Sequence, residues 1–544
     1  MSGRARPGLI QTEQVLKPQG RHIAAWTKYS LRTVFQPICR LLMADAPVFR
    51  LYNSMTRQVD AVEPLEDGHL RFYACGPTVY TYAHIGNFRS FLTADLINRT
   101  AQALGWETTF VSNVTDVGHL TQDDLVDPEG ADKMAAALER EGQRFANIYD
   151  LARYYTGALL DDWHALNLQN PDVRPRATEH IAHQIKAVER LMERGHAYET
   201  DQGVYFSVET FPEYGKLSGN EAAEQLQATE RETVQDPDKK DPRDFALWKK
   251  DPDHLMQWHS PWGWGFPGWH IECSAMSMAY LGEAFDLHTG GEDLAFPHHE
   301  CEVAQNECLT GATSVRYWVH TRFLQVEGEK MSKSSGNFFT VRDLIEPPED
   351  GGRGVDPLAL RYTLMAGQYR KPFNFTKKTL SDSARIIRRY QDAAEQVEEA
   401  LQADEEGPDH AADTLPDCYD ATLAAMCDDL NTPKALATAL EGVKFIQGLG
   451  RDLNGATART AQQWLVDTND LLGIIWHQGD AEAAATGENA DLATKVNALL
   501  DERAAARESG DYDRADAIRD ELDAMGIEVM DAPDGTTWKR KAVL

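Results

Sequence analysis

The segment RFYACGPTVYTYAHIGN, residues 71–87, decides the fold of this chain. Residues 71–75 form a short aromatic-rich run that Gly76-Pro77 ends, which predicts a strand followed by a turn. Residues 88–104 then carry apolar side chains at helical spacing, and residues 108–114 have the composition of a second strand. Strand, turn, helix and strand make a βαβ unit, which implies a parallel sheet.

The rest of the chain first interrupts this pattern and then leaves it. Helical and polar segments separate the βαβ unit from strand-like runs at residues 285–288 and 322–326, and helical spacing dominates after about residue 356. The sequence therefore predicts an α/β fold in which a Rossmann-like parallel-sheet domain carries an inserted subdomain. The predicted parts are a catalytic domain at residues 46–345 with an insertion at about 120–252, an α-helical bundle at 346–480, and a small C-terminal α/β module at 490–544.

Composition bounds the class of protein. The 544 residues are too many for a single core. The sequence contains no apolar run of about 18 residues, which is the length that would indicate a membrane span. The net charge is −32, with 86 acidic and 54 basic residues. We interpret this surface as an adaptation to a salty cytoplasm, with a dedicated acidic surface for a partner as the alternative. Seven cysteines without dense spacing indicate a reducing compartment, and we expect a cytoplasmic location.

The first 42 residues differ from the rest because Glu13 is their only acidic residue among several arginines and lysines. We interpret residues 1–45 as a disordered extension, or as the product of a start site placed too early, with Met43 as the true beginning. An organellar transit peptide is the alternative, since such leaders are basic and poor in acidic residues.

Two short motifs suit phosphate groups. HIGN at residues 84–87 falls at a helix N-terminus, where free N–H groups and the positive end of the dipole favour an anion. KMSKS at residues 330–334 places two lysines beside small hydroxyl residues, as a cationic clamp for a triphosphate would require. Each motif alone also fits a capped turn or a solvated lysine loop. Together and in this order they resemble the paired HIGH and KMSKS signatures of class I aminoacyl-tRNA synthetases.

A third pattern combines metal-ligand residue types. It comprises GWHIEC at residues 268–273, DLHTGGED at residues 286–293 and FPHHECE at residues 296–302. His298 and Glu302 are spaced i, i+4, so a helix would present both on one face. Cys273 and Cys75 add two thiolates, and this mixture of ligand types is plausible for zinc. For each residue taken singly, a structural role is the better explanation.

Taken together, these stretches resemble the cysteinyl-tRNA synthetase family, from about residue 48 to the C-terminus. The resemblance implies zinc ligands at Cys75, Cys273, His298 and Glu302, an amino-acid pocket of Gly76, Thr115, Trp269 and Asp293, and ATP contacts from His84, Gly86, Asn87, Lys330 and Lys333, of which His84, Lys330 and Lys333 are catalytic. Asn87 replaces the last histidine of the class signature. The chain also departs from many relatives at Val117-Gly118-His119 and at Trp264 and Phe266, which leaves the details of the pocket open.

The resemblance also implies a reaction and its partners. L-cysteine and ATP, with Mg²⁺, would form cysteinyl-adenylate and pyrophosphate, and cysteine would then pass to the 3′-terminal adenosine of tRNA(Cys). One Zn²⁺ per chain would select the cysteine thiol over the serine hydroxyl, because zinc prefers a thiolate. We expect a monomer. The basic residues of segment 377–389 and of the tail at 539–541, beside Trp538, are candidates for contacting the tRNA.

Three other interpretations compete with this one. A cysteine ligase of mycothiol synthesis, acting on an amino-sugar, would share the catalytic half but would lack a region like residues 490–544. A non-catalytic paralogue would have lost His84, Lys330, Lys333 or a zinc ligand, and all are present. A purely structural zinc protein would leave the two phosphate motifs without a purpose.

Overall fold

The computed structural model describes residues 47–118, 120–122, 129–219, 239–331, 336–477, 499–500, 502–503, 506–507, 511–524, 527–532 and 535–540. Residues 1–45, Lys333, His119 and part of the segment 490–544 therefore lie outside the described residues. The described chain divides into two compact units, one spanning residues 47–476 and one within residues 477–540, and each is considered by itself.

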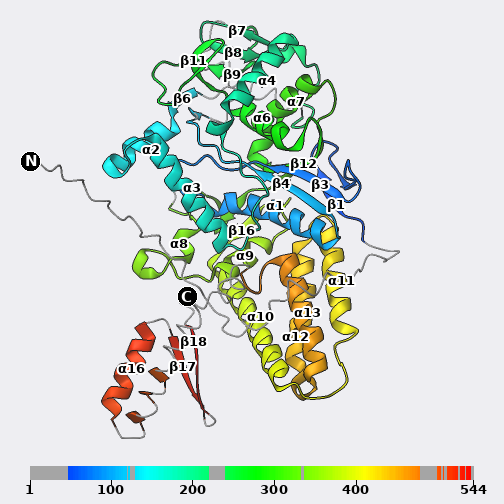
Figure 1. Ribbon diagram of the computed structural model, residues 1–544, viewed down its shortest axis with the longest axis vertical. Coiled ribbons are helices and arrows are strands. Elements are labelled where there is room, and N and C mark those ends of the chain that lie inside the picture. The colour runs from blue at the N-terminus through cyan, green and yellow to red at the C-terminus, as the bar shows by residue number, and fades with distance from the viewer. Residues whose placement is uncertain are drawn as a thin grey trace, which may run out of the picture. The chain divides into compact units, whose positions relative to one another are not determined.

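A four-stranded parallel sheet with the order β13-β12-β3-β4 forms the centre of the larger unit (Figure 1). Its strands are β3 (His69–Ala74), β4 (Glu107–Ser112), β12 (Phe285–Gly291) and β13 (Val315–Thr321). Phe72 pairs with Phe110 on one side and with Leu287 on the other, so aromatic and aliphatic side chains fill the middle of the sheet. The predicted α/β class with a parallel sheet is confirmed.

Helix α1 (Ile85–Ala103) is buried on almost every side. It contacts all four strands of the central sheet and also α9, α11 and α13 of the helical region, so it has neighbours on both faces. This position explains why its apolar residues are not confined to one stripe. The predicted helix at residues 88–104 is therefore found, beginning three residues earlier.

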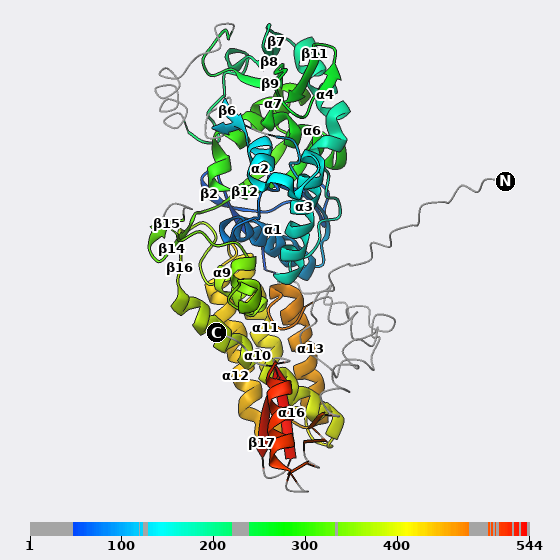
Figure 2. The ribbon, with the colours of Figure 1, turned by 90° about the vertical axis from the view of Figure 1, so that its left-hand side faces the viewer.

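The insertion forms a second layered body at one end of this unit (Figures 1 and 2). Its antiparallel sheet has the order β10-β11-β9-β8-β7, and its core includes Phe206, Phe245 and Trp248. This body contains α4 (Ile181–Glu193), β7 (Ala197–Glu199), β8 (Gly203–Phe206), β9 (Phe245–Lys249), β10 (Trp258–Ser260) and β11 (Gly263–Pro267). The chain before α4 forms β5 (Leu120–Gln122), β6 (Glu129–Asp132), α2 (Lys133–Glu141) and α3 (Ile148–Ala165), and α2 and α3 bury their apolar residues in the same core as α1. Helices α6 (Trp269–Leu281) and α7 (Glu300–Thr310) link the second body to the central sheet.

A small third sheet follows β13 and corrects one expectation. The run at residues 322–326 contains β14 (Leu324–Val326), but this strand does not belong to the central sheet. It pairs with β15 (Glu329–Lys330) and with β16 (Phe373–Phe375), whereas β13 supplies the edge strand of the central sheet. The chain separates β13 from β14 at Arg322-Phe323, so the apolar pattern of residues 322–326 marks a strand of a different sheet.

Helices make up the remainder of the larger unit. They are α8 (Arg342–Ile345), α9 (Pro357–Met365), α10 (Lys377–Ala403), α11 (Thr414–Cys427), α12 (Thr432–Leu449) and α13 (Gly455–Leu472). The last four pack on one another as a bundle at the end opposite the insertion (Figures 1 and 2). A Cβ on Gly442 of α12 would lie 2.2 Å from the Trp464 ring of α13, so the glycine permits this close helix approach.

A buried ionic network joins α1 to the helical region. Asp95 lies 2.9 Å from Arg99 and 2.5 Å from Arg361, and all three side chains are fully buried. Arg361 also donates to the carbonyls of Leu472 and Asn167, so α9, α13 and the end of α3 meet at one guanidinium. Every charge here has a partner, which is the condition for tolerating buried ions.

The smaller unit contains helix α16 (Tyr512–Ala524) and a hairpin of β17 (Ile527–Ala532) and β18 (Gly535–Arg540). The two strands pair antiparallel from Ile527 with Arg540 to Ala532 with Gly535, and α16 contacts β17. Within the described residues of either unit, helices that combine the length and the apolar character needed to cross a bilayer are absent.

Candidate metal centre and nucleotide site

The chain order of the central sheet points to the location of the site. From β3 the chain continues to β4 on one side, while β12 lies on the other side of β3. Ligands of open α/β sheets bind beyond the carboxyl ends of the strands where the order reverses in this way. Cys75 directly follows β3, and its N–H donates to the carbonyl of Thr289 in β12.

The four residues predicted as zinc ligands come together at this point. Cys75 Sγ lies 3.8 Å from Cys273 Sγ and 3.8 Å from Glu302 Oε1. His298 Nε2 is 3.1 Å from Glu302 Oε1, and the donor atoms of all four residues lie within 4.8 Å of one another. The four side chains come from the end of β3, from α6, from the turn before α7 and from α7, and all are buried.

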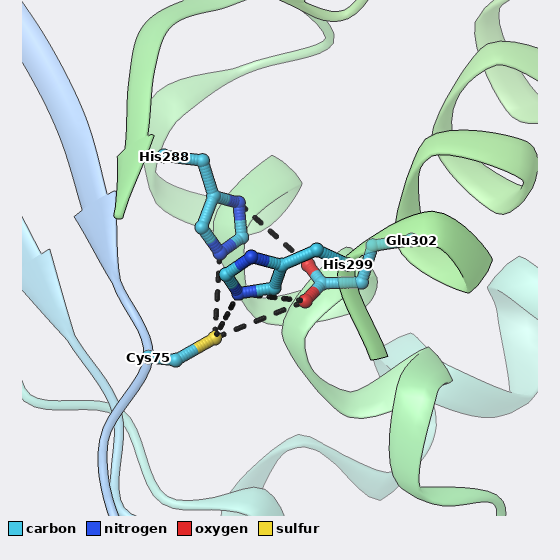
Figure 3. A group of neighbouring side chains, drawn as sticks. All are labelled: Cys75, His288, His299 and Glu302. Atoms are coloured by element: carbon cyan, nitrogen blue, oxygen red, sulfur yellow. Dashed lines mark hydrogen bonds and ion pairs between the residues drawn. The ribbon is translucent and has the colours of Figure 1, made fainter. Parts of the chain in front are cut away.

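A second donor group overlaps the first. His288 Nε2 and His299 Nε2 each lie 3.3 Å from Cys75 Sγ, and Glu302 completes this group (Figure 3). His299 Nε2 is 4.0 Å from Glu302 Oε1, and its Nδ1 is 2.8 Å from His320 Nε2. The pocket thus offers six donor residues, of which Cys75 and Glu302 belong to both groups.

Burial shifts these groups toward their neutral forms. Burial, with Cys273 and Glu302 nearby, raises the pKa of the Cys75 thiol well above its usual value. Burial and the neighbouring Cys273 likewise raise the pKa of Glu302. Burial and His320 lower the pKa of His288 to about 3. A divalent cation would favour the ionised thiolates and carboxylate while leaving the histidines neutral, so the donor set suits a metal ion.

Backbone and polar contacts form one wall beside the donor group. A Cβ on Gly76 would lie 1.7 Å from the Asn113 carbonyl oxygen, so no larger residue fits between β3 and β4 there. The N–H of Gly76 donates to Asn113 Oδ1, and Asn113 Nδ2 donates to Thr115 Oγ1. The Thr115 hydroxyl in turn donates to Glu272 Oε2 at 3.3 Å. Gly76 and Thr115 therefore lie in one connected polar wall.

An aromatic side chain and an acidic one complete the surroundings. The ring of Trp269, at the start of α6, lies 4.3 Å from the ring of His298 between centroids. His298 Nδ1 is 3.0 Å from His270 Nδ1, so the residue after Trp269 orients this histidine. Asp293 is exposed just after β12, and a Cβ on Gly291 would lie 2.3 Å from its carboxylate.

The HIGN segment caps α1 as predicted. His84 Nδ1 accepts from the N–H of Asn87, and the Asn87 side chain accepts from the N–H of His84. A Cβ on Gly86 would lie 2.9 Å from the His84 ring and 3.4 Å from the Met331 methyl group. The two phosphate motifs therefore meet at Gly86 and Met331. Lys330 is exposed at the end of β15.

Sequence reasoning did not single out three histidines of the pocket. His288, His299 and His320 were missed, although His288 and His320 lie in the neighbouring strands β12 and β13. The position of His320 at a strand end was the available signal, but β13 itself was not recognised. Cys301, in contrast, belongs to neither donor group and lies 3.4 Å from the Tyr214 hydroxyl.

Two departures from the family pattern meet in one contact. His254 Nε2 lies 3.0 Å from the Gly118 carbonyl oxygen, and the His254 ring stacks on Phe266 at 3.8 Å between centroids. A Cβ on Gly118 would lie 2.3 Å from Asp132 Oδ1, which the glycine avoids. Gly118 and Phe266 therefore both contact the same side chain, that of His254.

Comparisons with known proteins agree with this geometry. Residues 61–385 match the class I (C) tRNA synthetase catalytic domain, residues 423–476 match the DALR domain, and residues 489–538 match the cysteinyl-tRNA ligase anticodon binding domain. A methionyl-tRNA synthetase structure from Mycobacterium tuberculosis, bound by methionyl-adenylate, aligns with a TM-score of 0.53 over 76% of this chain and 96% of that chain. At 14% identity this likeness shows the fold alone.

Whole-length relatives give the same answer. The cysteine–tRNA ligase of Salinibacter ruber is 66% identical over 511 residues, covering 91% of this chain and 99% of the relative. The cysteine–tRNA ligase of Chlorobaculum tepidum is 40% identical over 90% of this chain and 99% of the relative. The chain therefore belongs to the cysteine–tRNA ligase family of class I aminoacyl-tRNA synthetases.

Proposed function

We propose that this chain activates L-cysteine with ATP and transfers it to the 3′-terminal adenosine of tRNA(Cys), with zinc selecting the thiol. The observation that carries the proposal is the convergence of Cys75, Cys273, His298 and Glu302 at the reversal point of the sheet. Family membership supports the reaction. The donor group adds a reason why cysteine is the substrate.

The distances within this group fit a zinc ion. A tetrahedral site with Zn–S bonds of about 2.3 Å has sulfur atoms about 3.8 Å apart, and one with Zn–N and Zn–O bonds of about 2.0 Å has these atoms about 3.3 Å apart. Cys75 and Cys273 are separated by 3.8 Å, and His298 and Glu302 by 3.1 Å. Two thiolates, an imidazole and a carboxylate are also the ligand types that zinc accepts.

Bound zinc would supply a site that prefers a thiolate to a neutral hydroxyl, which distinguishes cysteine from serine. An apolar pocket separates such similar side chains by only about 10². We assign the other contacts of the amino acid to residues around the donor group. Gly76, Thr115 and Trp269 would enclose the substrate, and Asp293 would lie beside it.

ATP is assigned to the N-terminus of α1. His84, Gly86 and Asn87 would contact the nucleotide, and Lys330 and Lys333 with Mg²⁺ would stabilise charge on the phosphate groups during adenylate formation. The short space between Gly86 and the Met331 methyl group, which an added Cβ would fill, supports this assignment because it places the start of the KMSKS segment beside the cap of α1. His84 and the two lysines would act through position and charge, so no protein nucleophile is needed.

The tRNA would be bound by the helical and C-terminal parts, which we assign to residues 346–480 and 490–544 of a monomer. The exposed Lys377-Lys378 and Arg385 of α10 are candidate phosphate contacts, although Asp382 neutralises part of this charge. The match of residues 489–538 to an anticodon binding domain disfavours the amino-sugar ligase, which needs no such region.

Cysteine-dependent exchange of pyrophosphate into ATP tests the proposal. We expect exchange with cysteine and none with serine, and we expect Cys273→Ala to lose both bound zinc and exchange. Full exchange by zinc-free protein, or equal exchange with serine, would refute the role of zinc. Charging of tRNA(Cys) by the same preparation separates this activity from that of an amino-sugar ligase.

A further inference from the structure

The β14–β15 hairpin, which ends at Lys330, is hydrogen-bonded to strand β16. β14 pairs with β15 on one side and with β16 on the other. The turn of the hairpin is also held, because the N–H of Glu327 donates to the Phe375 carbonyl and the N–H of Gly328 donates to Asn374 Oδ1 at 2.7 Å. The hairpin and β16 therefore form one small body, whose orientation determines where Lys330 lies.

Arg89 connects this body to α1. It is 2% exposed and follows Gly86 on the first turns of the helix. Its Nη1 donates to the Arg322 and Phe323 carbonyls, and its Nη2 donates to the Gln368 carbonyl at 3.0 Å and to the Lys371 carbonyl at 2.9 Å. The first pair of carbonyls lies just before β14, and the second pair lies in the segment that leads into β16. One guanidinium thus binds both chain segments that lead into the small sheet, the one before β14 and the one before β16.

Glu292 contacts the same two residues, Arg322 and Phe323, which we call the Arg322-Phe323 joint, and it accepts hydrogen bonds from their N–H groups. Its carboxylate accepts from the N–H of Phe323 at 2.5 Å and from the Arg322 guanidinium. Glu292 directly follows β12 and precedes Asp293 of the proposed amino-acid pocket. The Arg322-Phe323 joint is therefore fixed to the helix that carries HIGN and also to the strand end that borders the pocket.

We propose that Arg89 is a positioning residue for adenylate formation, which sets the β14–β15 hairpin, and with it Lys330, against the N-terminus of α1. Glu292 serves as its counterpart on the side of the amino-acid pocket. Neither side chain needs to contact substrate, because each acts through the Arg322-Phe323 joint. The inference rests on the proposed function to the extent that Lys330 acts on ATP.

The chemistry of the side chain explains why arginine occupies this position. A guanidinium presents five N–H donors in a rigid plane, so it can serve two pairs of carbonyls at once, whereas an ammonium group presents three donors from a single point. Burial lowers the pKa of Arg89 to about 10, which still leaves it protonated at neutral pH. Arg89→Lys keeps the charge, but one ammonium group cannot donate to both pairs of carbonyls.

Steady-state ATP–pyrophosphate exchange of the full chain tests the inference. For Arg89→Lys we expect kcat/KM for ATP to fall by about 10², the size of effect that a displacement of about 1 Å produces. Binding of cysteine in the absence of ATP, measured by calorimetry, should remain near the native value. Glu292→Gln keeps an acceptor for the N–H of Phe323 but removes the negative charge that pairs with Arg322, and it should lower kcat/KM for ATP by a smaller factor.

Arg99→Lys is the matched control, because Arg99 is a second buried arginine of α1 that donates to Asp95 and to carbonyls of the helical region. We expect this variant to melt at a lower temperature and to keep the native KM for ATP. If Arg89→Lys and Glu292→Gln both change only the melting temperature, the positioning role is wrong. Absence of cysteine-dependent exchange by the native chain would instead refute the proposed function.

Discussion

Two histidines that are adjacent in the sequence enter the metal pocket with different partners. His298 Nε2 lies 3.1 Å from Glu302, and His299 Nε2 lies 3.3 Å from Cys75 while its other nitrogen contacts His320. Because His298 completes the group with two thiolates, we expect His298→Gln to lose most of its bound zinc and His299→Gln to retain about one zinc per chain. Elemental analysis of the purified variants, without any activity assay, measures this.

The opposite pattern would assign the metal to the other donor group. A Co²⁺-substituted protein gives an independent readout, because the intensity of thiolate-to-metal absorption reports the number of cysteine ligands. Two thiolates are expected from Cys75 and Cys273 in the native protein, and most of the signal should disappear in Cys273→Ser, as bound zinc does in Cys273→Ala. An unchanged signal in that variant would place the metal with His288 and His299.

The limit of sequence reasoning at this scale is visible in the same pocket. The family resemblance predicts Cys75, Cys273, His298 and Glu302 as ligands, and the structure brings their donor atoms together. The spacing of the residues alone could not do this, since Cys75 and Cys273 are far apart in the chain. Side chains that converge only through the pairing of parallel strands carry no local signal, and His320 is an example.

At the scale of elements, α3 and α8 meet through a buried carboxylate. Asp162 of α3 lies 3.1 Å from Arg342 of α8. Burial outweighs this attraction and, with Asp161 and Glu346 nearby, raises the pKa of Asp162 to about 7. Between about pH 4 and pH 7 the folded state therefore holds a proton that the unfolded state has lost, because an unfolded aspartate ionises near pH 3.9.

The stability contributed by Asp162 should consequently fall as the pH rises through this window. One retained proton corresponds to about 1.4 kcal/mol of unfolding free energy per pH unit. We expect the native protein to lose stability between pH 5 and pH 7 relative to Asp162→Asn, as measured by denaturant unfolding at each pH. Asp150→Asn is the control, because Asp150 lies on the same helix, its side chain is 37% exposed, and it is not among the charges that raise the pKa of Asp162, so the slope should be unchanged. Parallel curves for the native protein and Asp162→Asn would contradict the assignment.

Elements were predicted well where they are long and poorly where they are short. Helix α1 was located from its apolar spacing, since 19 residues provide several turns of periodicity. β14 spans three residues, which give a strand composition but no indication of the strand it will pair with. Its assignment to the central sheet was therefore wrong, and β13, whose pairing with β12 depends on distant residues, was overlooked.

At the scale of the whole molecule, adenylate formation and anticodon recognition are assigned to separable parts. Every described residue of the metal pocket and of the α1 cap belongs to the unit at residues 47–476, whereas the anticodon-binding match at residues 489–538 falls in the other unit. The buried network of Asp95, Arg99 and Arg361 lies wholly within the first unit. Deleting the second unit therefore leaves these charges paired.

A chain ending at Trp476 should therefore melt cooperatively and keep cysteine-dependent ATP–pyrophosphate exchange near the native rate. Its charging of tRNA(Cys) should fall by tenfold or more, because losing the contacts of one module costs at least about 1.4 kcal/mol of binding free energy. Aminoacylation at several tRNA concentrations measures this, and the loss should appear mainly in KM. Asp95→Asn in the truncated chain is the control for folding, since it leaves Arg99 and Arg361 without their carboxylate and should abolish exchange through instability. A truncated chain that is folded but inactive in exchange would show that the C-terminal unit supports the catalytic site directly.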